Sequence, residues 1–441
     1  MDFYSEYRSK LRTPDEAVKV IKSGDWVDYS AALAKPVLLD EALSRRRDEL
    51  TDVKIRGNLM DGPVHVAECD PSQEHFIYHT WHCSAYERSL CDKGMCYYTP
   101  MVFHNLAAYY TFFITVDVAM VSVTPMDKHG YFGFSIHTGT TGEILRRAKT
   151  VILEINEQLP KVRGGYDDCI HISDVDYIVE GEHKPFAKKP AHEISENERR
   201  IAENILPYVK DGATIQIGIG GMPDAVGSLL ARSDLKDLGM HTELCSDAYL
   251  ELYHSGKLTN RLKNLNKEKQ VLGFAIGSPE LYDWLDDNPS VLTFPLEYVN
   301  NPSVIGKIDN MVSINSCITV DLFGQVCAES VGTRQISGTG GQLDFLEGAS
   351  ISRGGKSFIC LNSTYTDAEG NIHSCILPHF QGDIVTSPRS QVYYIATEYG
   401  VVNLEGASSW ERAERLISIA HPTFRDRLIR EAEKMKIWRK T

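Results

Sequence analysis

The chain has 441 residues, which predicts two or three domains at about 150 residues each. It carries 46 Lys and Arg against 60 Asp and Glu, a formal net charge of −14 at pH 7. That balance argues against a nucleic-acid-binding protein, whose phosphate contacts need clustered Lys and Arg, and against a protein held on an anionic membrane. An anionic ligand must therefore bind in a local pocket that works against the field of the whole chain.

The targeting features indicate a cytoplasmic protein with no membrane partner. The first residues include acids and contain no apolar run typical of a signal peptide. The stretch 106–125, LAAYYTFFITVDVAMVSVTP, is long enough to raise the question of a membrane span. Asp117 lies in its middle and Pro125 ends it, so we expect a short apolar helix or turn followed by a buried strand.

The ten cysteines are scattered, and without a secretory signal we expect them to be reduced thiols. Soft side chains are densest at His79, His82, Cys83, Cys91 and Cys96. A zinc site is one interpretation of this patch, but no CxxC pair or HxxxH helix supports it. We favour buried side chains near a pocket and predict no bound metal.

Two segments repeat the same pattern. Residues 14–43 and residues 196–230 each begin with an amphipathic helix pattern that ends at a glycine, Gly24 or Gly212. In both, a short alternating strand, small residues and then a proline that opens another apolar-periodic helix follow. The two frames agree within one residue, which indicates a domain duplication.

A second pair of segments supports the duplication. Asp127–Gly130 and Asp321–Gly324 share an Asp-x-x-Gly pattern, each after an apolar strand and before another strand. Short apolar strands alternate with helical patterns throughout, most clearly at 53–60, 150–157, 270–277, 357–362 and 392–400. This alternation predicts an α/β fold with parallel or mixed sheets flanked by helices.

A boundary between the two copies is predicted within residues 181–198, which are rich in Pro, Lys and Glu and lack an apolar period. Ser195 with Glu198 three residues later is typical of a helix N-terminus. We therefore expect two α/β domains, residues 1–190 and residues 191–441.

The segment QIGIGGMPDAV, residues 216–226, is the most informative. A strand runs into Gly218, Gly220 and Gly221, after which Pro223 is expected to begin a helix. Such a loop at the carboxyl end of a strand lets backbone amides approach an oxyanion or a phosphate. The pattern is not the GxGxxG of nicotinamide-binding folds, and an ordinary strand–helix turn is the alternative interpretation.

Two further segments contain candidate functional residues. HTELCSDAY, residues 241–249, contains Glu243 beside small polar residues, although a single Glu is usually a solvated charge. ISGTGGQLDF, residues 336–345, is a Ser/Gly-rich loop whose alternative interpretation is a flexible surface loop. The apolar residues at its end, including Phe345, indicate that it packs against the core.

These segments together resemble a known family. GIGGMPDAV, HTELCSDA, ISGTGGQLDF and the C-terminal ATEYGVVNLEGASSWERAERLISIAHPTFRDRL resemble the acetyl-CoA hydrolase/transferase family of family I CoA-transferases, over nearly the whole chain. The segment TWHCSAYERSLCDKGMCYYTP and the chain length are most similar to 4-hydroxybutyrate CoA-transferases, with butyryl-CoA:acetate CoA-transferases close by.

The resemblance implies two similar open α/β/α domains, with Glu243 as the nucleophile of a ping-pong CoA transfer. CoA would be a substrate that forms a covalent glutamyl-CoA thioester, with no permanently bound cofactor. The other substrates would be short-chain acyl groups and carboxylates such as acetate, and a homodimer is the default expectation. Because the first copy reads SAALAKP at 30–36, without glycines, the second should hold the catalytic loop. Residues expected to contact CoA or the reacting carbonyl are Gln216, Gly218, Gly220, Gly221, Met222, Pro223, Asp224, Gly340 and Gly341.

Three alternatives remain at this point. An acyl-CoA hydrolase would use the same fold and nucleophile with water as the acceptor. A CoA or nucleotide sensor would bind without catalysis, and a sugar-phosphate isomerase would leave the family segments near both ends unexplained. The sequence does not choose between 4-hydroxybutyrate, butyrate and propionate, because one methylene discriminates by only about 1–3 kcal/mol.

Overall fold

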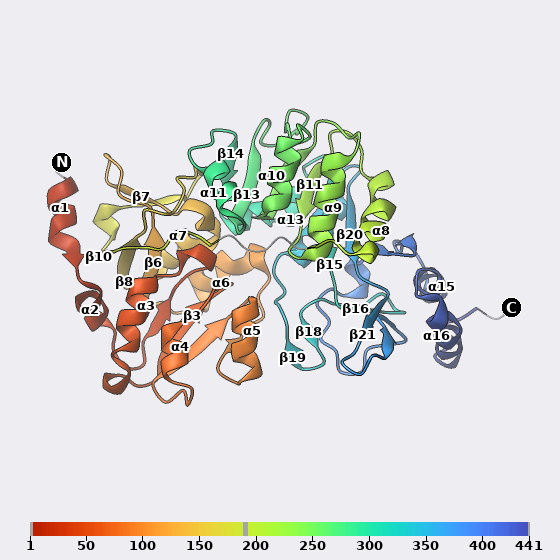
Figure 1. Cartoon of the computed structure of the whole chain (residues 1–441), viewed down its shortest axis with the longest axis horizontal. Helices are drawn as coiled ribbons and strands as arrows, with labels where there is room; N and C mark the ends of the chain where they lie inside the picture. Colours follow the sequence, from red (N-terminus) through yellow and green to blue (C-terminus); the bar gives the residue numbers. More distant parts are fainter. Residues whose placement is uncertain (1–2, 188–192, 440–441) are drawn as a thin grey trace. The chain divides into compact units, whose positions relative to one another are not determined.

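A computed structural model describes residues 3–187 and 193–439 (Figure 1). The chain forms two compact units that interleave along the sequence. Unit 1 comprises residues 1–189, 271–299 and 335–340, and unit 2 comprises residues 190–270, 300–334 and 341–441. The division into duplicated domains at residue 190 stays a prediction.

Unit 1 is built on a parallel sheet of eight strands in the order β1-β10-β8-β6-β2-β3-β4-β5. The strands are β1 (Leu11–Arg12), β2 (Trp26–Asp28), β3 (Val53–Gly57), β4 (Phe76–Thr80), β5 (Tyr97–Tyr98), β6 (Val118–Val123), β8 (Thr150–Ile155) and β10 (Tyr177–Glu180). Its helices include α1 (Phe3–Lys10), α2 (Pro14–Ala17), α3 (Val37–Ser44), α4 (His65–Cys69), α5 (Ala85–Asp92), α6 (Leu106–Phe112) and α7 (Thr138–Arg147). The segment 270–299 adds β13 (Gln270–Ala275), α11 (Pro279–Leu285), β14 (Val291–Thr293) and α12 (Leu296–Val299).

Unit 2 contains neighbouring strands in the order β12-β11-β15-β20-β24-β25, parallel except for the antiparallel pair β24 and β25. They are β11 (Thr214–Ile217), β12 (Gly239–Cys245), β15 (Met311–Ser316), β20 (Lys356–Cys360), β24 (Tyr394–Thr397) and β25 (Gly400–Asn403). The helices are α8 (Glu196–Ile205), α9 (Gly221–Arg232), α10 (Asp247–His254), α13 (Pro302–Ile305), α14 (Gln342–Ile351), α15 (Ser409–Ser418) and α16 (Pro422–Lys434). Leu416 of α15 and Leu428 of α16 join the apolar core that contains Ile359 and Ile395 of the sheet.

The two units repeat one strand order. The series β3-β2-β6-β8-β10 in unit 1 corresponds, strand by strand along the chain, to β12-β11-β15-β20-β24 in unit 2. The Asp-x-x-Gly turns match as well, because the carboxylates of Asp127 and Asp321 each accept hydrogen bonds from two backbone N–H groups of their turn. The predicted α/β fold and the duplication are confirmed. The copies differ at one edge, where β1 is parallel and β25 antiparallel.

The positive φ angles expected of Gly24 and Gly212 are confirmed, at 87° and 73°. The expectation that the helices end at these glycines is wrong, because the helical segments end at Val20 and Tyr208 and each glycine lies in the turn that follows. Other local predictions are confirmed. Ser195 caps α8 and forms the predicted capping box with Glu198. The apolar stretch 106–125 is the short helix α6 followed by the fully buried strand β6. In the described residues no helix combines the length and apolar character needed to cross a bilayer.

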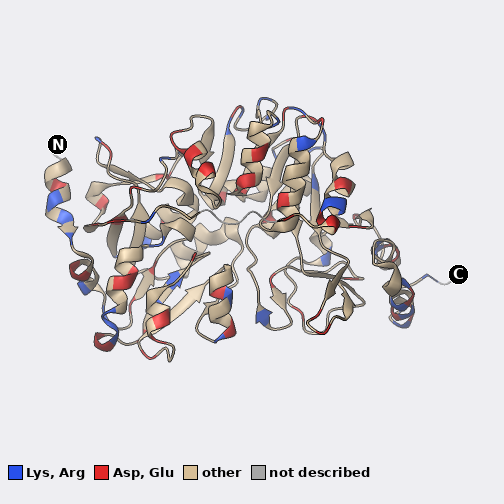
Figure 2. Cartoon of the chain, in the orientation of Figure 1, with Lys and Arg blue, Asp and Glu red and all other residues tan. Residues whose placement is uncertain are grey.

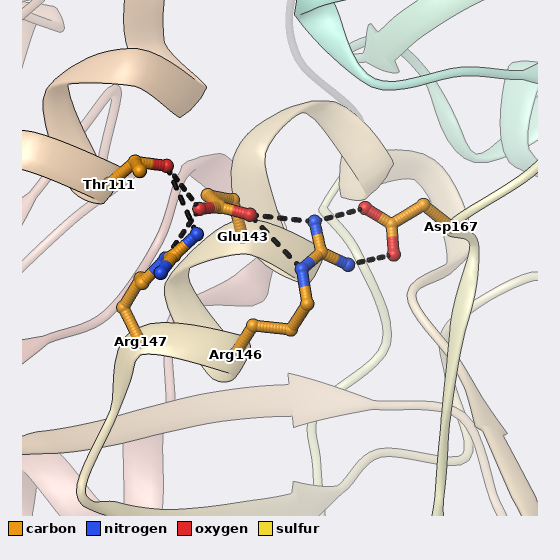
Figure 3. Close-up of polar contacts among 5 residues, drawn as sticks. All are labelled: Thr111, Glu143, Arg146, Arg147 and Asp167. Carbon is orange, nitrogen blue, oxygen red and sulfur yellow. Dashed lines mark hydrogen bonds and ion pairs between the residues drawn. The ribbon is translucent and has the colours of Figure 1, made fainter.

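Acidic and basic residues lie on helices of both units (Figure 2), and α10 carries Asp and Glu but neither Lys nor Arg. One cluster lies where α6 and α7 meet in unit 1 (Figure 3). There the Glu143 carboxylate accepts hydrogen bonds from Thr111 (2.7 Å), Arg147 (2.6 Å) and Arg146 (2.8 Å and 3.0 Å). Arg146 also donates two bonds to Asp167. Both guanidinium groups are thus held by carboxylates of the protein itself.

Candidate active site

Glu243 lies near the carboxyl end of β12, next to the end of β11. The two strands pair in parallel, with Thr214 opposite Gly239 and Ile215 opposite Met240. By that register, Gly218 and Glu243 occupy corresponding positions of neighbouring strands. Ligands of open α/β sheets bind at this end of the strands, so the fold of unit 2 gives Glu243 the position that the sequence predicts for a functional carboxylate.

The Glu243 carboxylate is held by an amide and a backbone donor. Asn300, just before α13, donates from Nδ2 to Oε2 of Glu243 at 2.6 Å, and Gly341 donates its backbone N–H. The same Nδ2 donates to the Asp344 carboxylate at 3.3 Å. Asn300 and Asp344 are both fully buried. Because two carboxylates share one NH₂ group, the Asn300 amide is fixed with its donor side toward Glu243.

Gly341 is required by close approach. A Cβ atom at this position would overlap Oε2 of Glu243 and Nδ2 of Asn300. Only glycine therefore lets the backbone N–H reach the carboxylate. Gly341 is also the N-cap of α14, so the positive end of that helix lies beside Glu243.

The surroundings make Glu243 hard to ionise. The pKa of Glu243 is raised to about 8. Burial is the main cause, and the negative charge of Asp344 contributes in the same direction. Hydrogen bonds from Asn300 and Gly341 act in the opposite direction without outweighing burial. A carboxyl group with a strongly shifted pKa beside fixed donors is typical of a functional site. Its anion, once formed, is poorly solvated and reactive.

The predicted glycine loop connects β11 to α9. Gly220 has φ 117° and ψ 175°, a conformation essentially restricted to glycine, and it precedes the first residue of the helix, Gly221. Met222, Pro223 and Asp224 form the first turn, so α9 begins two residues earlier than predicted. The N-terminal end of this 12-residue helix follows β11, which pairs with the strand that carries Glu243.

Gln216 and Gly218 pack against the neighbouring strand β15. The side-chain amides of Gln216 and Asn315 exchange two hydrogen bonds of 3.0 Å, and Gln216 is 3% exposed. A Cβ on Gly218 would crowd Oδ1 of Asn315. These contacts give both residues a structural role in joining β11 to β15. Their predicted contact with CoA or the reacting carbonyl stays a prediction.

Residues 335–340, the loop that leads to Gly341, belong to unit 1. Oγ of Ser337 lies 3.0 Å from Nε2 of His82. The carbonyl oxygen of Ser337 accepts a hydrogen bond from the N–H of Cys83 at 3.3 Å. Phe345 and Leu346 of α14 are buried, which confirms that the loop packs on the core.

The His and Cys patch is an apolar environment. His79 contacts the rings of Trp26 and Tyr97, and burial lowers the pKa of His79 and of His82 to about 4. No group of three His, Cys, Asp or Glu side chains in the described part of the chain is arranged to hold a metal ion.

Sequence reasoning missed two residues of the site. Asp344 lies inside the quoted GTGGQLDF segment, but nothing in that segment shows that it is buried beside Glu243. Asn300 precedes Asn301 and Pro302, a pattern that indicates only a helix N-terminus, and Asn301 does cap α13. The approach of these two residues to Glu243 depends on the tertiary fold.

Comparison with known proteins gives a consistent result. The sequence model of the acetyl-CoA hydrolase/transferase N-terminal domain matches residues 1–190, and that of the C-terminal domain matches residues 277–432. A butyryl-CoA:acetate CoA-transferase from Anaerostipes caccae is 47% identical, with 100% of both chains covered. The crystal structure of RipA from Yersinia pestis is 36% identical with a TM-score of 0.91, covering 99% of this chain and 100% of RipA. A crystal structure of a 4-hydroxybutyrate CoA-transferase from Porphyromonas gingivalis is 34% identical with a TM-score of 0.81, covering 98% and 100%.

Proposed function

The chain belongs to the acetyl-CoA hydrolase/transferase family and is a CoA-transferase, and we propose that it exchanges CoA between a short-chain acyl-CoA and acetate. Butyryl-CoA and 4-hydroxybutyryl-CoA are the proposed acyl donors, after the names of two of its relatives. The observation that carries the proposal is the Glu243 carboxylate, held by Asn300 and Gly341 with its pKa raised.

The reaction begins with attack of the Glu243 carboxylate on the thioester carbonyl. A C–O bond forms, the C–S bond breaks, and CoA leaves as a thiolate from a mixed acyl–glutamyl anhydride. The thiolate then attacks the glutamyl carbonyl, releasing the first carboxylate and leaving a glutamyl-CoA thioester. Acetate repeats both steps in reverse, so ping-pong kinetics are expected.

Asn300 and Gly341 supply the electrostatic stabilisation in this mechanism. Each tetrahedral intermediate at the glutamyl carbon carries an oxyanion on a former oxygen of Glu243. The donors already bonded to that carboxyl group are positioned to stabilise it, and one such donor contributes about 3 kcal/mol to lowering the barrier. The negative charge of Asp344 raises the pKa of Glu243 and so destabilises its carboxylate. A destabilised carboxylate is the stronger nucleophile toward the thioester.

The glycine loop is the proposed CoA contact. Residues 218–221 connect β11 to the start of α9, and Met222, Pro223 and Asp224 follow in the first helical turn. The N–H of Gly218 donates to the Ile314 carbonyl at 2.9 Å, so the candidate backbone donors are those of Gly220 and Gly221. We propose that these residues, with Gln216, Gly340 and Gly341, line the path of the thioester and the pantetheine arm. The cytoplasmic location, a role in fermentation and the homodimer also belong to this proposal.

The test is the intact mass of the full chain after brief exposure to butyryl-CoA without acetate. We expect a CoA adduct that disappears when acetate is added and does not form in Glu243→Gln. Glu251→Gln, an exposed glutamate on α10, is the matched control and should retain the adduct.

Three outcomes would contradict the proposal. Steady consumption of butyryl-CoA without acetate would favour the hydrolase. A Glu243→Gln variant that keeps its transferase activity would exclude the assigned nucleophile. Binding of butyryl-CoA without any turnover would favour the sensor.

A further inference from the structure

Three cysteines of unit 1, at or near the ends of helix α5, have their side chains close together. Cys83 precedes the N-cap Ser84, Cys91 lies in the last turn, and Cys96 immediately precedes β5. Sγ of Cys83 lies 3.8 Å from Sγ of Cys91, and Cys96 also forms a hydrogen bond with Cys91. Cys83 and Cys96 are 4% and 6% exposed, whereas Cys91 is only partly buried. One thiol thus contacts both others and also reaches the surface.

The environment of Cys91 is that of a reactive thiol. Hydrogen bonds from Cys83 and Cys96 lower the pKa of Cys91, and this effect outweighs its burial. Burial instead raises the pKa of the equally half-buried Cys69 and Cys169 to about 11. A thiolate that is accessible and lies beside a second thiol is the arrangement found in redox-sensitive cysteines.

We propose that Cys91 is a thiol–disulfide exchange site, with Cys83 as its resolving thiol and a low-molecular-weight disulfide as its oxidant. The Cys91 thiolate attacks the disulfide RS–SR, forming Cys91–S–SR and releasing RS⁻. Cys83 then attacks the Cys91 sulfur, the S–S bond between Cys91 and the SR group breaks, and the proton of Cys83 leaves with the second thiol, RSH. The product is a Cys83–Cys91 disulfide, and two RSH equivalents carry the electrons away.

The same elements hold the loop that leads into the site. The N–H of Cys83 donates to the Ser337 carbonyl at 3.3 Å, and Arg88 of α5 donates to the Ile336 carbonyl at 2.9 Å. Tyr98, two residues after Cys96, accepts from the N–H of Thr339 at 2.9 Å. This loop continues directly into Gly341.

Disulfide formation draws Cys83 and Cys91 together beside these attachments. A disulfide bond is about 2.0 Å long, so the two sulfur atoms have to approach from 3.8 Å. Because the backbone of Cys83 is bonded to Ser337, a shift of Cys83 is transmitted to the loop. Small misplacements of a catalytic donor cost large factors in rate, so we infer that oxidation lowers transferase activity reversibly.

The experiment treats the reduced full chain with oxidised glutathione, quenches with iodoacetamide, and maps the cysteines by peptide mass spectrometry. We expect a Cys83–Cys91 disulfide, a loss of activity of about tenfold or more, and recovery with dithiothreitol. In Cys83→Ser the glutathione should remain on Cys91, because the resolving thiol is missing. Cys91→Ser should keep its activity under oxidant, and Cys69→Ser, the matched control, should behave like the unmodified protein.

Each contrary result has a definite meaning. No modification at Cys91, or a disulfide elsewhere in the chain, overturns the site, and the mapping on the unmodified protein gives this result even where a variant fails to fold. Formation of the disulfide with full activity overturns the transmission to the loop. The mapping does not depend on the proposed transferase reaction, so its failure and the failure of that proposal are distinguishable.

Discussion

Glu243 combines a partly buried position with a task that requires its anion. A carboxylate attacks a thioester, whereas a carboxylic acid does not, so the active fraction of free enzyme grows as pH rises. With a pKa of about 8 for Glu243, we expect kcat/KM for butyryl-CoA to rise with pH and to level off above about 9. The measurement is the initial rate between pH 7 and 9.5 at fixed ionic strength.

The Asp344→Asn variant is the comparison for the pH profile of kcat/KM. Asp344→Asn removes a negative charge that raises the Glu243 pKa, so the rise should move to lower pH. A profile that is level from pH 7 upward in the unmodified protein would contradict the raised pKa. An unchanged profile in Asp344→Asn would show that Asp344 does not act through charge.

Asn300 is the side chain whose loss should affect Glu243 most. Asn300→Ala removes the 2.6 Å hydrogen bond and leaves two carboxylates without their shared donor. A hydrogen bond to a charged group contributes about 1.5–3 kcal/mol, which predicts a fall in kcat of roughly 10- to 100-fold. Steady-state kinetics check this, with Asn301→Ala, which removes only the cap of α13, as the control. Equal losses in the two variants would mean that the effect is structural.

At the scale of elements, the junction of α6 and α7 depends on the carboxylate of Glu143. Burial by itself raises the pKa of Glu143, but hydrogen bonds from Arg147, Thr111 and Arg146 outweigh it, and the pKa is lowered. A lowered folded-state pKa stabilises the protein above the unfolded value of about 4.3, and this contribution is lost as pH falls through the folded-state pKa.

Glu143→Gln should therefore lower the melting temperature by a few degrees at pH 7, because Arg147 loses its carboxylate partner and Arg146 loses one of its two, at a cost of about 1–3 kcal/mol. The difference from the unmodified protein should shrink as pH falls below about 4. Differential scanning calorimetry at several pH values measures both effects. Glu41→Gln, at an exposed pair with Arg45, should change little, and a difference that grows toward acid pH would contradict the assignment.

The elements that could be predicted from the sequence are those determined by residues close together in the chain. The capping box at Ser195, the strand 214–217 and the paired Asp-x-x-Gly turns all depend on residues within one turn or one strand, and the structure confirms them. The start of α9 was misplaced because glycines at 220 and 221 obscure the first helical turn. Asn300 approaches Glu243 from 57 residues away, so its role depends on packing that no local pattern records.

At the scale of the whole molecule, duplication left one copy with the glycine loop. The strand order is the same in both units, so the first copy also places a loop after β2. That loop lacks glycine and instead forms a short 3₁₀ turn at Ala32–Ala34, with Ser30 and Ala32 at positive φ. The corresponding loop of unit 1 thus contains no glycine, whereas the glycine loop of unit 2 follows the strand that pairs with the strand of Glu243.

The net charge of −14 makes a further prediction for the whole molecule, because CoA is itself anionic. Long-range repulsion should slow association at low salt and be screened as the Debye length falls from about 30 Å at 0.01 M to about 10 Å at 0.1 M. We expect kcat/KM for butyryl-CoA to rise a few-fold over this range at constant acetate. Butyryl-pantetheine has the same thioester without the phosphates, so its kcat/KM should stay constant. A decrease with salt for butyryl-CoA alone would instead mean that basic groups near the site dominate the field that the substrate meets.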